Sequence, residues 1–122
     1  MLSAFMLSSC SSKEEPQVEN NDEYYVKYEF SMTSRYILEN TITFTTEKGA
    51  QSVIIKGKTQ SWIATYGPLK KGTKVILNTI CNNNLSATSN ARIYVSKNKD
   101  PFVIKAEDSG NHSFDLSYTI DF

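Results

Sequence analysis

Apolar and polar residues alternate over most of the chain after residue 23. Between residues 24 and 32 every second side chain is apolar: Tyr24, Val26, Tyr28, Phe30 and Met32. The segment from Phe114 to Phe122 repeats this pattern. A period of two is typical of a β-strand with one buried face, and both segments are therefore predicted to be strands.

Six shorter segments of strand-like composition lie between these two, at residues 40–46, 51–56, 60–66, 69–80, 91–97 and 102–106. Turn residues such as Gly49, Gly57 and Gly67-Pro68 separate several of them. No segment carries a sustained apolar stripe with the 3.6-residue period of a helix, and the short connections favour antiparallel neighbours. The pattern predicts an all-β fold, specifically an immunoglobulin-like antiparallel β-sandwich of about seven strands.

Charge divides the chain into two parts. The whole sequence has 122 residues, enough for one domain, and a net charge of zero, which argues against a nucleic-acid partner. Residues 11–23 hold one lysine and five acidic residues, whereas residues 24–122 have a net charge of +4. The only apolar residue of the acidic segment is Val18, so burial cannot offset the entropy of ordering it. We therefore expect a disordered acidic tether ahead of a folded domain.

The residues before Cys10 have the character of a secretory signal. An apolar run, "AFML", is followed by two small residues. The sequence Leu7-Ser8-Ser9-Cys10 resembles the bacterial lipobox, which implies that a diacylglyceryl group is attached to the Cys10 sulfur and that cleavage occurs just before it. On this interpretation residues 1–9 are the remnant of a lipoprotein signal peptide, 10–23 the lipidated cysteine and tether, and 24–122 the β-sandwich. The alternative is a chance match within a structural segment.

The charged residues after Cys10 bear on location. Lys13 and Glu14-Glu15 resemble the signal that sends Bacteroidetes lipoproteins to the outer face of the outer membrane, although a solvated charge run remains the alternative. No apolar run approaches the length of about 18 residues that a transmembrane helix needs. We therefore expect a surface-exposed lipoprotein of the cell envelope, held to the membrane through its lipid.

Candidate catalytic residues are few. His112 is the only histidine, and the residues near it in sequence form a polar turn rather than a catalytic triad. Cys81 lacks a partner and is interpreted as a half-buried small apolar residue. No zinc, calcium or phosphate motif is present, although a calcium site built from several loops stays open. We expect no enzymatic activity, no metal and no cofactor.

Aromatic side chains are the candidate ligand contacts. Trp62, Tyr66 and Tyr94 can stack on a sugar ring if they face outward, with a core position as the alternative for Trp62. Five lysines near two turns can form a basic rim or simply a solvated face: Lys56, Lys58, Lys70, Lys71 and Lys74. The connecting segments 33–40, 82–90 and 107–113 are the expected binding surface, because loops at one end of a sandwich commonly carry function.

The order of the segments "YVKYEF", "NTITFTTEKG", "GPLKKGTKVIL" and "ARIYVSKNKDPF" resembles a family of small immunoglobulin-like lipoproteins of Bacteroidetes. That family is related to the C-terminal domain of mycobacterial MmpS proteins. The resemblance implies a fold and no catalytic residue. The leading hypothesis is a lipid-anchored binding or adhesion module of the cell envelope, with an unknown protein or glycan ligand. The alternatives are a periplasmic accessory subunit of a lipid or solute transport complex and a carbohydrate-binding module.

Overall fold

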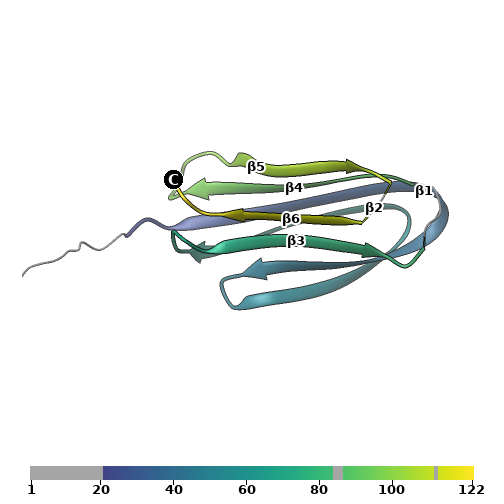
Figure 1. Ribbon diagram of the computed structural model, residues 1–122, viewed down its shortest axis with the longest axis horizontal. Helices are drawn as coiled ribbons and strands as arrows, with labels where there is room; N and C mark the ends of the chain where they lie inside the picture. The colour runs from purple at the N-terminus through teal and green to yellow at the C-terminus, as the bar shows by residue number, and fades with distance from the viewer. Residues whose placement is uncertain (1–20, 84–86, 112) are drawn as a thin grey trace, which may run out of the picture.

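The computed structural model describes residues 21–83, 87–111 and 113–122 (Figure 1). These residues hold six strands: β1 (Tyr24–Thr46), β2 (Gly49–Leu69), β3 (Lys74–Cys81), β4 (Ala87–Lys97), β5 (Val103–Gly110) and β6 (Phe114–Thr119). Every pairing is antiparallel, and the strand order is β5-β4-β1-β3-β6, with β2 paired to β1. Within the described segments, none of the chain forms a helix long and apolar enough to span a membrane.

Strands β1 and β2 form one long, bent hairpin that organises the sheet. The first half of β1 pairs with β4 and with the end of β2, whereas its second half pairs with β3 and with the start of β2. The bend brings the halves of β1 together, since the Tyr28 hydroxyl donates a hydrogen bond to the Thr45 carbonyl oxygen at 2.7 Å. The sheet therefore curls around a single core.

The outer strands β5 and β6 meet along a seam that makes the sheet nearly closed. Each pairs with an inner strand, β5 with β4 and β6 with β3. Side chains span the seam: the Lys105 ammonium lies 4.0 Å from the centroid of the Phe122 ring. The Tyr24 hydroxyl also donates to the Phe122 carbonyl oxygen and so fixes the end of the chain against β1.

The prediction of an all-β, antiparallel fold is confirmed, and the described residues form six strands where about seven were expected. Segments 24–32 and 40–46 belong to one strand, β1, and segments 51–56 and 60–66 belong to one strand, β2. Pairing between β1 and β2 is interrupted between Thr33 and Leu38 and resumes beyond Gly57. The residues between the predicted segments therefore bend the two strands instead of ending them. The two expected layers are consequently parts of one continuous sheet.

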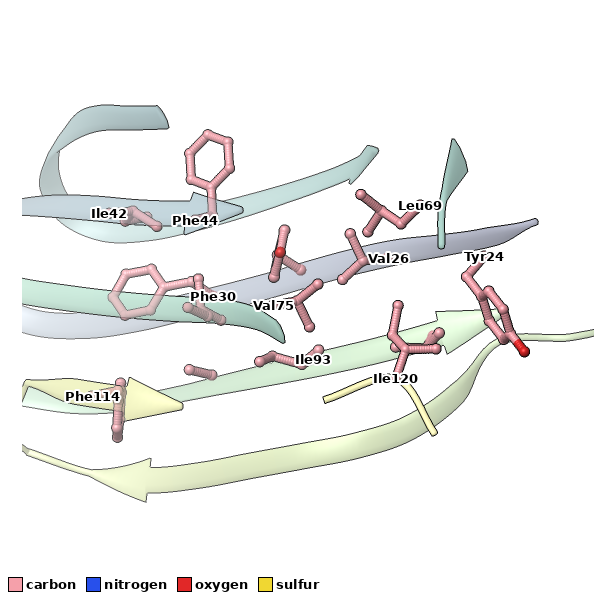
Figure 2. Close-up of a cluster of buried hydrophobic side chains, with 14 of the residues drawn as sticks. Tyr24, Val26, Phe30, Ile42, Phe44, Leu69, Val75, Ile93, Phe114 and Ile120 are labelled. Atoms are coloured by element: carbon pink, nitrogen blue, oxygen red, sulfur yellow. The ribbon is translucent and has the colours of Figure 1, made fainter. Parts of the chain in front are cut away.

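The inward face of β1 supplies much of the core. Its predicted alternation is confirmed, because Tyr24, Val26 and Tyr28 are fully buried and Phe30 and Met32 nearly so. Figure 2 shows Tyr24, Val26 and Phe30 in one cluster with residues of other strands, Val75, Ile93 and Phe114, and with Phe44 from the second half of β1. Burial of a large apolar side chain contributes about 1.5–3 kcal/mol, so this face dominates the energetics of folding.

A buried polar pair holds the bend of the hairpin. Asn40 and Gln60 are 3% and 4% exposed, and Asn40 Nδ2 donates to Gln60 Oε1 at 2.9 Å. Gln60 Nε2 in turn donates to the carbonyl oxygens of Leu38 at 2.8 Å and Gly57 at 3.1 Å. Buried polar groups need such partners. These bonds tie β2 to β1 where the regular pairing of the two strands is interrupted.

Candidate functional site

The described residues of the three segments expected to form the binding surface come together at the end of the molecule opposite Tyr24, whereas residues 84–86 and 112 of these segments lie outside the described residues (Figure 1). Ser34 of β1 pairs with Ala87 of β4, and Ser89 pairs with Gly110 of β5. The segments 33–40, 82–90 and 107–113 are not simple loops, because the first lies within β1 and the others include parts of β4 and β5. Strands rather than loops therefore position this end of the molecule.

Residues 34–37, here called the tip segment, project where the pairing of β1 with β2 is interrupted. Thr33 pairs with Thr59 and Leu38 pairs with Gly57, so four residues of β1 lie opposite one residue of β2. The surplus residues put two apolar side chains into solvent, Tyr36 at 45% and Ile37 at 66% exposure. The Tyr36 backbone N–H donates to the Ser34 hydroxyl at 3.1 Å, which gives the segment a local turn.

A shallow depression of about 240 Å³ adjoins the tip segment. Its lining residues are Thr33, Ser34, Arg35, Ala87 and Thr88, of which three carry a hydroxyl group and one a guanidinium. The Arg35 side chain makes no hydrogen bond or ion pair within the part of the chain that the structure describes. The depression therefore combines an available positive charge with hydrogen-bonding groups.

Two of the three predicted ligand contacts lie on the inner side of the sheet. Trp62 and Tyr66 are partly buried against the core, with ring centroids 4.8 Å and 5.2 Å from that of Phe44. The outward orientation expected for Tyr66 is wrong, because it pairs with Val26, whose side chain is fully buried. Trp62 and Tyr66 are four residues apart on one strand and therefore share a face.

The third predicted contact, Tyr94, lies on the outer face within a polar network. Its hydroxyl donates to Glu29 Oε1 at 2.8 Å, and Arg92 donates to the same oxygen at 3.1 Å and to Glu107 at 3.2 Å. The Tyr94 hydrogen bond, reinforced by Arg92, lowers the pKa of the Glu29 carboxyl against a smaller opposing effect of burial. The Lys27 ammonium lies 4.5 Å from the centroid of the Tyr94 ring. These contacts occupy Tyr94, whereas Tyr36 and Ile37 of the tip segment are exposed.

The five lysines that form either a basic rim or a solvated face by sequence are all exposed but lie in two places. Lys56 and Lys58 flank Gly57 at the bend, whereas Lys70, Lys71 and Lys74 follow the opposite end of β2. The single-rim interpretation is therefore wrong.

Cys81 has a free, partly buried thiol. Its backbone lies opposite that of Asn40 in the pairing of β3 with β1. His112 and Cys10 lie outside the described residues. Among the residues the structure does describe, no group of three or more His, Cys, Asp or Glu side chains is placed to hold a metal.

The tip segment falls within the range 33–40 that was expected to belong to the binding surface. Its signal in the sequence is the consecutive apolar run Tyr36-Ile37-Leu38, which breaks the alternation of the strand directly after a basic residue. No protein-family model, no curated protein and no solved structure matches this chain. The site is therefore characterised by its own geometry.

Proposed function

We propose that this protein is a binding module without catalytic activity that contacts its ligand through the tip segment and the adjoining depression. The exposed Tyr36 and Ile37 side chains carry the proposal. Aromatic and arginine side chains are enriched among the residues that dominate binding energy, and Arg35 and Tyr36 are adjacent here. Paired strands on both sides of the segment hold these side chains in place at little entropic cost on binding.

The proposal includes lipid attachment at Cys10, which makes the protein a binding or adhesion module anchored to the cell envelope. It also includes an immunoglobulin-like fold and a relation to the Bacteroidetes lipoproteins. The support is the lipobox-like sequence and the placement of Tyr24, which begins β1 at the end opposite the tip segment. An anchor that precedes Tyr24 leaves the tip segment facing away from the membrane. Attachment through two or more acyl chains is stable, since each buried CH₂ contributes about 0.8 kcal/mol.

The binding role is tested with Ile37→Ser. The matched control is Ile54→Ser, because Ile54 has nearly the same exposure, 64% against 66%, and lies on a different surface, in the first half of β2. Beads coated with the full chain are assayed for binding to intestinal mucin, an array of glycans and purified envelope proteins. We expect the best ligand to lose at least about tenfold in affinity with Ile37→Ser and less than about twofold with the control. Equal losses for both variants would contradict the assignment.

The anchor is tested separately by growth with a clickable palmitate. We expect the label on the natural chain and its loss in Cys10→Ala, because the cysteine sulfur carries the lipid. Protease treatment of intact cells then distinguishes two locations. Digestion supports a surface module, whereas protection favours the alternative role of a periplasmic subunit of a transport complex.

A further inference from the structure

We infer that the depression beside the tip segment binds a single sugar residue that carries a carboxylate. This inference rests on the proposed function and names the chemical class of its ligand. The lining of the depression, its charge and its size each support the assignment.

The charge comes from Arg35. The chain has only two arginines, and the other, Arg92, is paired with Glu29 and Glu107. Arg35 lines the depression with no such partner among the described residues. A guanidinium offers two parallel N–H donors that match the two oxygens of a carboxylate. An acidic ligand group therefore gains a charge-assisted bond here without breaking an ion pair among the residues that the structure describes.

The remaining polar lining suits the rest of a sugar. Thr33, Ser34 and Thr88 carry hydroxyl groups, which both donate and accept hydrogen bonds, and the Ser34 hydroxyl already accepts one from the Tyr36 N–H. Sugar hydroxyls also donate and accept, so the two sets are compatible. None of the described residues that line the depression is acidic, so a carboxylate meets no like charge from them.

Size limits the ligand to about one ring. The volume of about 240 Å³ lies below the range of roughly 300–1,000 Å³ typical of drug-sized ligand pockets. A helix or strand of a partner protein does not fit into such a space.

The experiment is an NMR titration of the ¹⁵N-labelled full chain with four probes. Sialyllactose and a hyaluronan tetrasaccharide carry carboxylates of two different sources, lactose is neutral, and a sulfated disaccharide carries a different anion. We expect at least one carboxylate sugar to shift the amide signals of Thr33, Ser34 and Thr88 and to bind at least about tenfold more tightly than lactose. Shifts that map elsewhere, equal binding of lactose, or tighter binding of the sulfated probe would each overturn the inference.

Two substitutions locate the charge requirement. Arg35→Ala is expected to weaken binding of the carboxylate sugar at least about tenfold and to remove the preference over lactose. Arg35→Lys keeps the charge without the paired donors and is expected to fall between Arg35→Ala and the natural chain. Lys56→Ala removes a nearby cation that does not line the depression, and less than about twofold change is expected. An Arg35→Ala variant that binds like the natural chain would refute the inference, provided its amide spectrum shows the native fold.

Failure of this inference is distinguishable from failure of the proposed function. If no carboxylate sugar binds but Ile37→Ser still abolishes binding to another probe, the ligand class is wrong and the binding role stands. If Ile37→Ser has no greater effect than its control on any probe, the binding role falls and the ligand assignment falls with it.

Discussion

Removal of the Gln60 side chain is expected to destabilise the fold through the bend of the β1–β2 hairpin. Gln60 is 4% exposed and makes three hydrogen bonds, to Asn40, Leu38 and Gly57. Gln60→Ala removes all three bonds at once. It leaves the Leu38 carbonyl oxygen without this partner, and Asn40 Nδ2 keeps only the sulfur of Met32 at 3.3 Å, a weak acceptor.

The magnitude follows from these bonds. Each intramolecular hydrogen bond contributes about 1 kcal/mol net, and a buried group left without its partner costs about 1–3 kcal/mol. We therefore expect the free energy of unfolding to fall by about 3 kcal/mol, a large part of the roughly 5–15 kcal/mol typical of a native protein. For a domain of this size, that loss lowers the midpoint of thermal unfolding by roughly 10–20 °C.

The assay is urea unfolding followed by the fluorescence of Trp62. It is the only tryptophan, and its ring lies 4.8 Å from that of Phe44, so its emission reports on the packed hairpin. Gln51→Ala is the control, because Gln51 is an exposed glutamine on the same strand. Its substitution is expected to change stability by less than about 0.5 kcal/mol. A loss below about 1 kcal/mol for Gln60→Ala, or one equal to that of the control, would refute the role of the buried pair.

Two further predictions concern the outer face and the end of β2. Tyr94→Phe removes the main cause of the lowered pKa of Glu29, so we expect that pKa to rise in a ¹³C carboxyl titration, while Tyr36→Phe leaves it unchanged. A carboxyl group whose pKa is lowered by folding stabilises the fold at neutral pH, and this contribution is lost as the pH falls through the carboxyl range. Tyr94→Phe should therefore lower the free energy of unfolding by a fraction of about 1 kcal/mol at pH 7 and by less in acid. Gly67 has a φ of +147°, and a methyl group added there lies 2.6 Å from the Tyr25 ring and 2.8 Å from the Tyr24 carbonyl oxygen. A methyl group added at Gly72 meets nothing within 4 Å. Thermal unfolding should therefore show that Gly67→Ala lowers the free energy of unfolding by about 2–4 kcal/mol and Gly72→Ala by about 1 kcal/mol. Equal losses for the two variants would contradict the close approach of Gly67 to β1.

The local pattern was sufficient for the strand faces and insufficient for the strand ends. Alternation from Tyr24 to Met32 identifies the buried face, because successive side chains of any strand point to opposite sides. The same pattern cannot tell whether Gly57 ends a strand or bends it. That outcome depends on whether a neighbouring strand resumes pairing beyond the break, which β1 does through residues 38–46.

The candidate site shows the same division. Tyr94 and Trp62 are both aromatic residues in predicted strands, and the sequence offers no means to rank them as ligand contacts. The structure pairs Tyr94 with Glu29 and packs Trp62 against Phe44, whereas Tyr36 remains exposed. Exposure follows from which strands lie alongside, and this is a property of contacts between residues far apart in sequence.

The sequence by itself therefore determined that the chain folds into antiparallel strands with an aromatic, one-sided core, because side-chain alternation is a local consequence of strand geometry. Only the tertiary structure decided that the strands form one bent and nearly closed sheet. It also decided that four residues of β1 face one of β2, which projects Tyr36 and Ile37 beside Arg35. The register of β1 against β2 depends on the buried contacts that Gln60 makes with Asn40 and Leu38. These contacts join two segments of the chain, so neither segment alone encodes the register.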